Sequence, residues 1–269
     1  MKINLLQDEH LQDSPTAAKA LEEIDTTLVE NFLAQTPRDY LGASGVGNPC
    51  ARAVQFDYIK AQKNEDRKHP PARILRIFER GHHAEHLVVK WFRNAGYHLT
   101  DRDYKTGRQF RFSAMGGLFS GGCDGVISEG PGILGPTLWE LKCVNTKKFG
   151  QFVRRGVKKV EPKYYAQLQL YMAYFNLTDY PALFTVLDSN DYSLHIEEVP
   201  FDPQAAQYYS DRAVSIIQDT NARAMAPRIS DNPSVFACRF CDFSDVCHSG
   251  ANPMLSPDFA PPQPPNQED

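Results

Sequence analysis

The stretch TLWELKCV, residues 137–144, decides how the fold is to be interpreted. Its apolar character predicts a strand within a sheet. Successive side chains of a strand point to opposite faces, so Glu140 and Lys142 share one face, opposite Trp139 and Leu141. A charge in an apolar strand is costly to bury unless it is paired or binds a metal. The stretch therefore predicts an acid–lysine pair with a function.

Two further carboxylates are candidates to bind a metal together with Glu140 of this strand. Asp124, in the glycine-rich run FSGGCDGVI, adjoins a predicted neighbouring strand. Asp124 and Glu140 are suited to converge on a hard cation such as Mg²⁺ or Mn²⁺, which prefers oxygen ligands. A long helix is predicted from about 71 to 94, and Glu85 falls on its apolar stripe. We favour Glu85 as the third ligand, with His86, about 100° round the helix, as the alternative.

A helix that begins at Glu161-Pro162 places a glutamine and two tyrosines on one face. In YYAQLQLYMAYF, Gln167 and Tyr171 are four residues apart and share a face with Tyr164. The plain interpretation is an aromatic stripe in the core. The alternative is that these polar groups hold the metal ligands or a nucleotide.

The order of the predicted elements indicates a mixed sheet flanked by helices, an α/β or α+β fold. We expect a helical segment at 1–40, a main domain at 41–249 and a disordered, proline-rich tail at 250–269. The expected elements are helices at 14–35, from about 49, and at 71–94, strands within 97–143, a helix from 161, strands at 182–188 and 193–199, and a helix at 203–224, with a glycine-rich loop at 41–50.

Charge is spread unevenly along a chain whose net charge is −4. Residues 1–31 are acidic, whereas a basic band follows the acid–lysine strand and comprises Lys147, Lys148, Arg154, Arg155, Lys158, Lys159 and Lys163. Such a band can track a phosphate backbone, although a solvated charged face is the common alternative. No apolar run is long enough to span a bilayer and no signal peptide is evident, so we expect a cytoplasmic protein without a membrane partner.

Three cysteines lie close together near the end of the chain, in a Cys-x2-Cys-x5-Cys spacing. Cys238, Cys241 and Cys247 favour a metal centre over disulfides if the compartment is reducing. Zinc and an iron–sulfur cluster both accept cysteine, and ligand type alone does not separate them. The candidates for a fourth ligand are Cys50, Cys123, Cys143 and His248. Cys50 opens a predicted helix, where the helix dipole favours a thiolate.

The motifs ERGHHAEH, GGCDGVI, WELK and QLQLY, taken in order, resemble those of PD-(D/E)XK nucleases of the RecB-like branch. The resemblance implies a restriction-endonuclease-like core at 41–249. It also implies a metal site and a catalytic set made of Glu85, Asp124, Glu140, the Leu141 carbonyl, Lys142, Gln167 and Tyr171. Glu85 stands where many relatives carry histidine, but lambda-type exonucleases use glutamate in a comparable role.

The cysteine pattern resembles that of iron–sulfur nucleases, namely the CRISPR-associated RecB-like exonucleases and the nuclease domain of AddB. One cysteine near the start and three near the end would then form an iron–sulfur cap that staples the two ends of the fold. The resemblance implies a structural [4Fe-4S] cluster, favoured over zinc, on Cys50, Cys238, Cys241 and Cys247.

The function expected from these resemblances is a Mg²⁺- or Mn²⁺-dependent DNA exonuclease acting on single strands or duplex ends. Its setting would be recombination, repair or CRISPR-type processing, with a phage origin and with a single-strand annealing or CRISPR adaptation protein as a partner. Lys147, Lys148, Arg154 and Arg155 would grip phosphates. The alternatives are a non-catalytic DNA-end-binding subunit and a zinc-stapled interaction protein.

Overall fold

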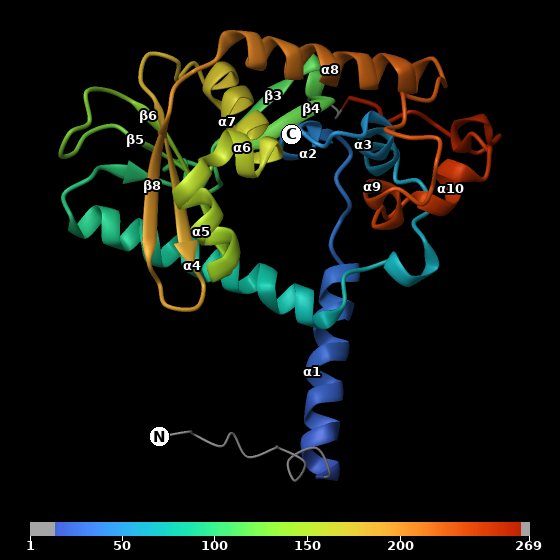
Figure 1. The fold of residues 1–269 in the computed structure, drawn as a ribbon, viewed down its shortest axis with the longest axis horizontal. Coiled ribbons are helices and arrows are strands. Elements are labelled where there is room, and N and C mark those ends of the chain that lie inside the picture. The colour runs from blue at the N-terminus through green and yellow to red at the C-terminus, as the bar shows by residue number, and fades with distance from the viewer. Residues whose placement is uncertain (1–13, 265–269) are drawn as a thin grey trace. The chain divides into compact units, whose positions relative to one another are not determined.

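The computed structural model describes residues 14–264 and divides them into two compact units (Figure 1). The smaller unit comprises residues 14–37 and 69–80, and the larger comprises residues 38–68 and 81–264. Residues 1–13 and 265–269 lie outside the description. The start of the expected acidic segment at 1–31 and the last residues of the expected tail at 250–269 are therefore not among the described residues.

The smaller unit contains helix α1 (Pro15–Leu33) and the first residues of helix α4 (Ala72–Asn94). The Ser14 side chain caps α1 by accepting a hydrogen bond from the Ala17 amide, and Pro15 occupies the first turn, where its missing N–H costs nothing. The predicted start of the helix is confirmed. No residue of α1 is buried, and Arg76 of α4 forms an ion pair with Asp25.

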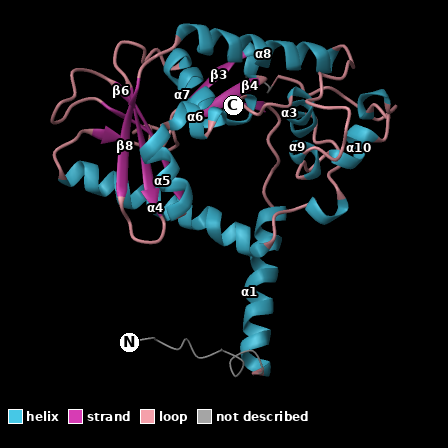
Figure 2. Cartoon of the chain, viewed as in Figure 1, coloured by secondary structure: helices cyan, strands magenta, loops and turns pink. Residues whose placement is uncertain are grey.

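The larger unit is built on a mixed five-stranded sheet (Figure 2). Its order is β2 (Leu99–Thr100), β5 (Gly125–Ile127), β6 (Thr137–Val144), β7 (Ala182–Asp188) and β8 (Leu194–Val199). Strands β6 and β7 are parallel, and the other neighbours are antiparallel. The predicted strand TLWELKCV has the same bounds as β6. Because the sheet contains both parallel and antiparallel pairs, the expected mixed sheet is confirmed.

A second sheet of three strands has the order β1 (Leu41–Gly42), β4 (Phe119–Gly122) and β3 (Arg111–Ala114). Strand β1 runs parallel to β4, and β3 runs antiparallel to it. The antiparallel strands expected between 97 and 143 are therefore present, but they are shared between two sheets. Only Cys123 and Asp124 separate β4 of one sheet from β5 of the other.

Both faces of the five-stranded sheet are covered. On one face Trp139 and Leu141 pack with Val88 and Phe92 of α4. On the other face Leu138 packs in a larger cluster with residues of α5 (Thr146–Arg155), α7 (Pro162–Tyr174) and α8 (Pro203–Asn221). Burial on both faces explains why β6 is apolar almost throughout. The apolar stripe expected on α4 is correct at Val88 and Phe92 but wrong at Phe78, which is half exposed.

The short helices α6 (Val157–Val160), α9 (Phe236–Arg239) and α10 (Ser244–His248) complete the larger unit with three 3-10 turns. We expected a disordered tail from residue 250, yet the described part up to Pro264 includes a 3-10 turn at Pro253–Leu255 with Met254 buried. Asn252 holds this turn by accepting a hydrogen bond from the Met254 amide. Among the described helices, none is long and apolar enough to cross a membrane.

The glycine-rich stretch at 41–50 is not the loop that the sequence suggested. It forms β1 and then helix α2 (Ala43–Val46), and the next helix, α3 (Ala51–Tyr58), begins after Cys50. The physical reason is close packing rather than turn formation. A Cβ on Gly47 would lie 2.6 Å from the Cβ of Ala166 on α7, so glycine is what lets this segment approach that helix.

Gly47→Ala tests this close approach. The added methyl would also lie 2.8 Å from the backbone Cα of Lys163, which cannot rotate away. We expect the free energy of unfolding, measured by urea denaturation, to fall by about 1–3 kcal/mol. The matched control is Gly45→Ala in α2, where a Cβ meets nothing within 4 Å, and helix propensity should raise stability by roughly 0.5–1 kcal/mol. Equal stabilities for the two variants would contradict this account.

Candidate active site

Glu140 is the centre of the candidate site. It lies in the middle of β6 and is only 1% exposed. Its Oε1 accepts hydrogen bonds from Lys142 Nζ at 2.6 Å and from Gln167 Nε2 at 2.7 Å. Its Oε2 is buried and has no hydrogen-bond partner among the described residues. A buried carboxylate oxygen without a partner is costly, so the site is incomplete without a further group.

Asp124 lies beside Glu140 because the chain passes between the two sheets at this point. Strand β5 pairs with β6 only at residues 137–139, which leaves the following edge of β6 without that neighbour. Asp124 Oδ2 accepts the Leu141 amide there at 2.9 Å, and Asp124 Oδ1 accepts Gln109 Nε2 at 3.3 Å. The N–H and C=O of one strand residue point to the same neighbour. The Leu141 carbonyl is therefore directed to the side of β6 on which Asp124 lies.

Two glycines before Asp124 allow other groups to approach the site. A Cβ on Gly121 would lie 2.7 Å from the Tyr171 ring, and a Cβ on Gly122 would lie 2.9 Å from Gln109 Oε1. Any larger residue would push Tyr171 and Gln109 away. The glycines of the GGCDGVI motif therefore serve close packing around the carboxylates.

Helix α7 delivers the predicted glutamine and tyrosine to Glu140. Gln167 and Tyr171 are 7% and 2% exposed, and Gln167 Nε2 also lies 3.1 Å from the Tyr171 hydroxyl. The Lys142 ammonium is held over the Tyr164 ring, 5.1 Å from its centroid. The aromatic-stripe interpretation is thus partly correct, because the tyrosines are packed. The polar groups of the same face nevertheless meet the acidic centre.

The third carboxylate, Glu85, is half-buried on α4, whereas His86 is exposed. Burial, and then the negative charge of Asp124, raise the pKa of Glu85 to about 7. Its electrostatic coupling to Asp124 and Lys142 places Glu85 in their neighbourhood. The two candidates on α4 therefore differ in burial as the apolar stripe suggested.

The electrostatics of the group show an excess of negative charge. Burial, and then the charge of Asp124, raise the pKa of Glu140 to about 8. Burial lowers the pKa of Lys142, but the charges of Glu140 and Asp124 outweigh it and hold that pKa above its usual value. Lys142 is therefore positively charged, and one ammonium faces three carboxyl groups. A bound cation would relieve this imbalance.

Within residues 14–264, no three His, Cys, Asp or Glu side chains meet in the arrangement of a metal site. The metal ligands Glu85, Asp124, Glu140 and Leu141 stay predictions for this reason. The residues present do fit a hard cation, because the donors are oxygens, carboxyl groups outnumber the one ammonium and Glu140 Oε2 lacks a partner among the described residues.

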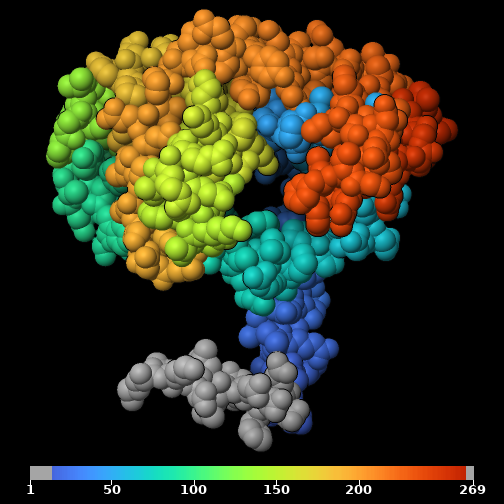
Figure 3. All heavy atoms as spheres, in the orientation of Figure 1, coloured from blue at the N-terminus to red at the C-terminus, as the bar shows by residue number. Residues whose placement is uncertain are grey.

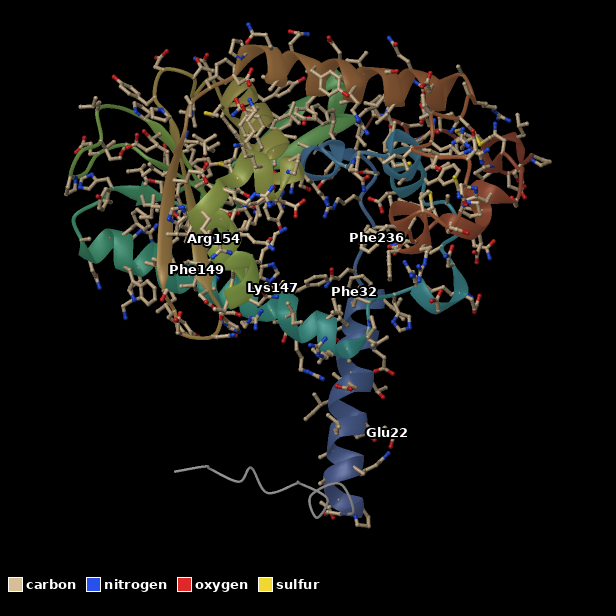
Figure 4. All side chains as sticks on the ribbon, viewed as in Figure 1. Glu22, Phe32, Lys147, Phe149, Arg154 and Phe236 are labelled. Atoms are coloured by element: carbon tan, nitrogen blue, oxygen red, sulfur yellow. The ribbon has the colours of Figure 1, made fainter. Side chains whose placement is uncertain are left out.

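The predicted phosphate-binding residues lie on α5, directly after β6 (Figure 4). Lys147, Arg154 and Arg155 are exposed, whereas Lys148 forms an ion pair of 2.9 Å with Glu161. Asn145 caps this helix by accepting a hydrogen bond from the Lys148 amide at 2.9 Å. Three of the four predicted residues are thus free to meet a ligand.

The four predicted cluster cysteines all lie in the larger unit, and the segment that carries three of them reaches the surface (Figure 3). Burial raises the pKa of Cys238 and of Cys241, and the charges of Cys50 and Cys247 raise both further. Cys241 Sγ accepts a hydrogen bond from the Phe243 amide at 3.5 Å. No three of these side chains meet in the arrangement of a metal site within residues 14–264, so the cluster stays a prediction.

Cys123 belongs elsewhere. It is fully buried, and its thiol pKa is raised by burial and then by Glu140 and Asp124, which places it beside the acidic site. Cys143 packs at the edge of the cluster formed with α4. Cys123 and Cys143 thus pack with apolar side chains of the core.

No pattern in the sequence indicates Gln109, which donates a hydrogen bond to Asp124 from the segment before β3. A single glutamine outside any periodic element cannot be distinguished from a surface residue. Tyr164, which the sequence placed on the same helix face as Gln167 and Tyr171, contacts Lys142.

No known family profile matches this sequence, and no curated protein resembles it in sequence. Solved structures are similar in fold. The crystal structure of SSO0001 aligns with a TM-score of 0.50 and 13% identity, covering 87% of this chain and 98% of that chain. An alkaline exonuclease, LHK-Exo from Laribacter hongkongensis, aligns in two crystal structures, one in complex with dAMP. Each has a TM-score of 0.46 and 17% identity, covering 75% of this chain and 93% of that chain. The likeness to SSO0001 shows a shared fold.

Glu85→Gln tests the electrostatic state of the site. A carboxyl whose pKa rises on folding from 4.5 to about 7 binds more protons when folded, so stability falls as the pH rises through this interval. Without divalent metal at pH 8, we expect Glu85→Gln to be more stable than the wild type by about 1–2 kcal/mol, allowing for solvent screening. The difference should shrink toward pH 5.

Thermal unfolding at the two pH values measures this effect. Glu198→Gln is the control, because Glu198 is an exposed carboxylate on β8. A Glu85→Gln protein whose stability relative to the wild type does not change with pH would show that Glu85 is not under electrostatic strain.

Proposed function

We propose that the chain is a metal-dependent DNA nuclease of the PD-(D/E)XK type. The observation that carries the proposal is the setting of Glu140, a buried carboxylate with one oxygen bound by Lys142 and Gln167 and the other without a described partner. A purely structural acid–lysine pair would gain nothing from a second and a third carboxyl group nearby. The order of the motifs supports the same assignment.

Glu85, Asp124, Glu140 and the Leu141 carbonyl would hold Mg²⁺ or Mn²⁺, which supplies an activated water and neutralises charge on the scissile phosphate. Lys142 keeps its proton and points its ammonium at Glu140, where it can hold the attacking water or stabilise charge on phosphate oxygens. Gln167 fixes the orientation of the Glu140 carboxylate, and Tyr171 fixes Gln167. Gln109 holds Asp124 in the same way.

The exposed cations on α5 favour a nucleic acid as the substrate. Lys147, Arg154 and Arg155 lie on the helix that follows β6, so they can bind phosphates next to those that reach Glu140. The resemblance of the motifs supports DNA as the substrate. It also supports exonuclease activity on single strands or duplex ends. The proposal includes recombination, repair or CRISPR-type DNA processing as the process that the nuclease serves. It also includes a phage origin for the protein.

Glu140→Gln and Asp124→Asn test the nuclease directly. Each removes a negative charge from the proposed metal site while it keeps the shape of the side chain. We expect the Mn²⁺-dependent release of nucleotides from an end-labelled strand to fall by a factor of at least about 10³, because metal activation of the water is lost. Affinity for DNA, measured by fluorescence anisotropy, should stay within a few-fold.

Glu198→Gln serves again as the control and should cleave at the wild-type rate. Full activity of Glu140→Gln would refute the assignment. A wild-type protein that binds DNA ends but cleaves neither strand with Mg²⁺ or Mn²⁺ would instead support the non-catalytic end-binding subunit.

We also propose that Cys50, Cys238, Cys241 and Cys247 hold a [4Fe-4S] cluster with a structural role. In its support, the charges of Cys50 and Cys247 both contribute to the raised pKa of Cys238 and of Cys241. Hydrogen bonds already join the same two parts of the chain. The Asn64 amide donates to the Asp242 carbonyl at 2.7 Å, and Asn64 Oδ1 accepts from the Asp245 amide at 3.1 Å. The cluster would add a covalent closure to these contacts.

Cys50→Ser tests the fourth ligand. Iron content and visible absorbance should both fall, and the melting temperature should fall with them, because the closure between the ends is lost. Cys143→Ser is the matched control and should keep the iron. A Cys50→Ser protein with undiminished iron and stability would show that another group, such as His248, completes the cluster. A colourless wild type that contains zinc would support the zinc alternative.

A further inference from the structure

The loop between β2 and β3 is tightly organised although it lies at the surface. Asp103 Oδ1 accepts hydrogen bonds from the amides of Lys105 at 3.0 Å and Thr106 at 2.8 Å. Backbone bonds of 2.8 Å join Asp103 to Gly107 and to Arg108. Gly107 has a φ of +65°, which suits glycine. The loop therefore has a defined conformation.

This ordered loop presents an aromatic ring to solvent. Tyr104 is 87% exposed, more than any other large apolar side chain of residues 14–264. The Lys105 ammonium lies 5.5 Å from the centre of its ring. A ring displayed in this way is available for stacking rather than for the core of the protein.

Both ends of the segment that carries the loop interact with the candidate active site, one through a hydrogen bond and the other electrostatically. At one end, Asp101 and Arg102 act electrostatically on Glu85. At the other end, Gln109 donates its hydrogen bond to Asp124. Tyr104 therefore projects from a segment that is bonded to Asp124 through Gln109.

The outer face of the loop is cationic. Arg102, Lys105 and Arg108 are exposed. The two acids in the loop are engaged elsewhere, since Asp103 binds backbone amides and Asp101 pairs with Arg93 at 2.6 Å. Arg102 keeps weak contacts with Asp101 at 3.9 Å and with the Gly107 carbonyl at 3.3 Å. A negatively charged ligand is thus complementary to this face.

We propose that the loop at 101–108 binds the unpaired part of a DNA strand that enters the active site, with Tyr104 stacking on one base. Every base offers a ring face, so such binding is tolerant of sequence, while Lys105 and Arg108 contact the adjoining phosphates. Paired bases within a duplex are already stacked and offer no free face. This inference rests on the proposed nuclease function and assigns its substrate as single-stranded at the point of entry.

The test measures binding of an oligonucleotide that carries 2-aminopurine, without divalent metal, so that the strand stays intact. Tyr104→Ala should raise the Kd for the single strand about tenfold, the effect of losing one base–aromatic contact, and should abolish the stacking-dependent quenching of 2-aminopurine. Tyr104→Phe should retain both. Tyr208→Ala, at an exposed tyrosine on α8, is the matched control and should bind like the wild type.

Salt dependence tests the cations separately. Changing Lys105 and Arg108 together to glutamine should reduce the slope of log Kd against log salt by roughly 0.7 for each lost phosphate contact. The Kd for a blunt hairpin duplex should change far less than that for the single strand.

Each contrary result has its own meaning. If the wild-type protein cleaves DNA but Tyr104→Ala binds the single strand with an unchanged Kd, the loop assignment is overturned. The proposed nuclease function would then still stand. Equal weakening for the single strand and the blunt duplex would overturn the single-strand assignment. A wild type that neither binds nor cleaves DNA would overturn both proposals.

Discussion

The burial of Glu140 is the constraint on which the arrangement of the larger unit depends. A carboxylate in the centre of a sheet covered on both faces requires hydrogen bonds and a compensating charge. Lys142 supplies the charge from the same face of the strand, and Gln167 supplies a hydrogen bond from α7. Because these contacts have fixed lengths, the register of β6 and the position of α7 are tied to one carboxyl group.

The glycines around the site follow from the same constraint. Asp124 reaches β6 only because the chain leaves one sheet and enters the other within two residues, and Tyr171 and Gln109 approach only where Gly121 and Gly122 lack side chains. This close packing concentrates three carboxyl groups near one lysine. The raised pKa values of Glu85 and Glu140 are the electrostatic consequence, and they are typical of a site built for a ligand rather than for stability.

The cysteine segment shows how distant parts of the chain can be held together by more than one means. Asn64 bonds to the backbone on both sides of Asp242, and the Phe56 and Phe243 rings pack edge to face at 5.9 Å. These contacts join helix α3, which begins after Cys50, to the segment of the C-terminal cysteines. A cluster at this point would reinforce an interface that polar and aromatic contacts already define.

Local sequence patterns were enough to predict the strand β6, the helices α4, α7 and α8, and the mixed sheet, because hydrophobic periods are local properties of the chain. They also identified Glu140, Lys142, Gln167 and Tyr171, whose spacing fixes the face on which each lies. The tertiary structure alone decided that Gln109 holds Asp124, that the glycine-rich stretch packs against α7, and that Lys148 is paired with Glu161. These contacts join residues whose distance in space is set by the crossing of two sheets and the packing of helices. No local period or spacing encodes such distances.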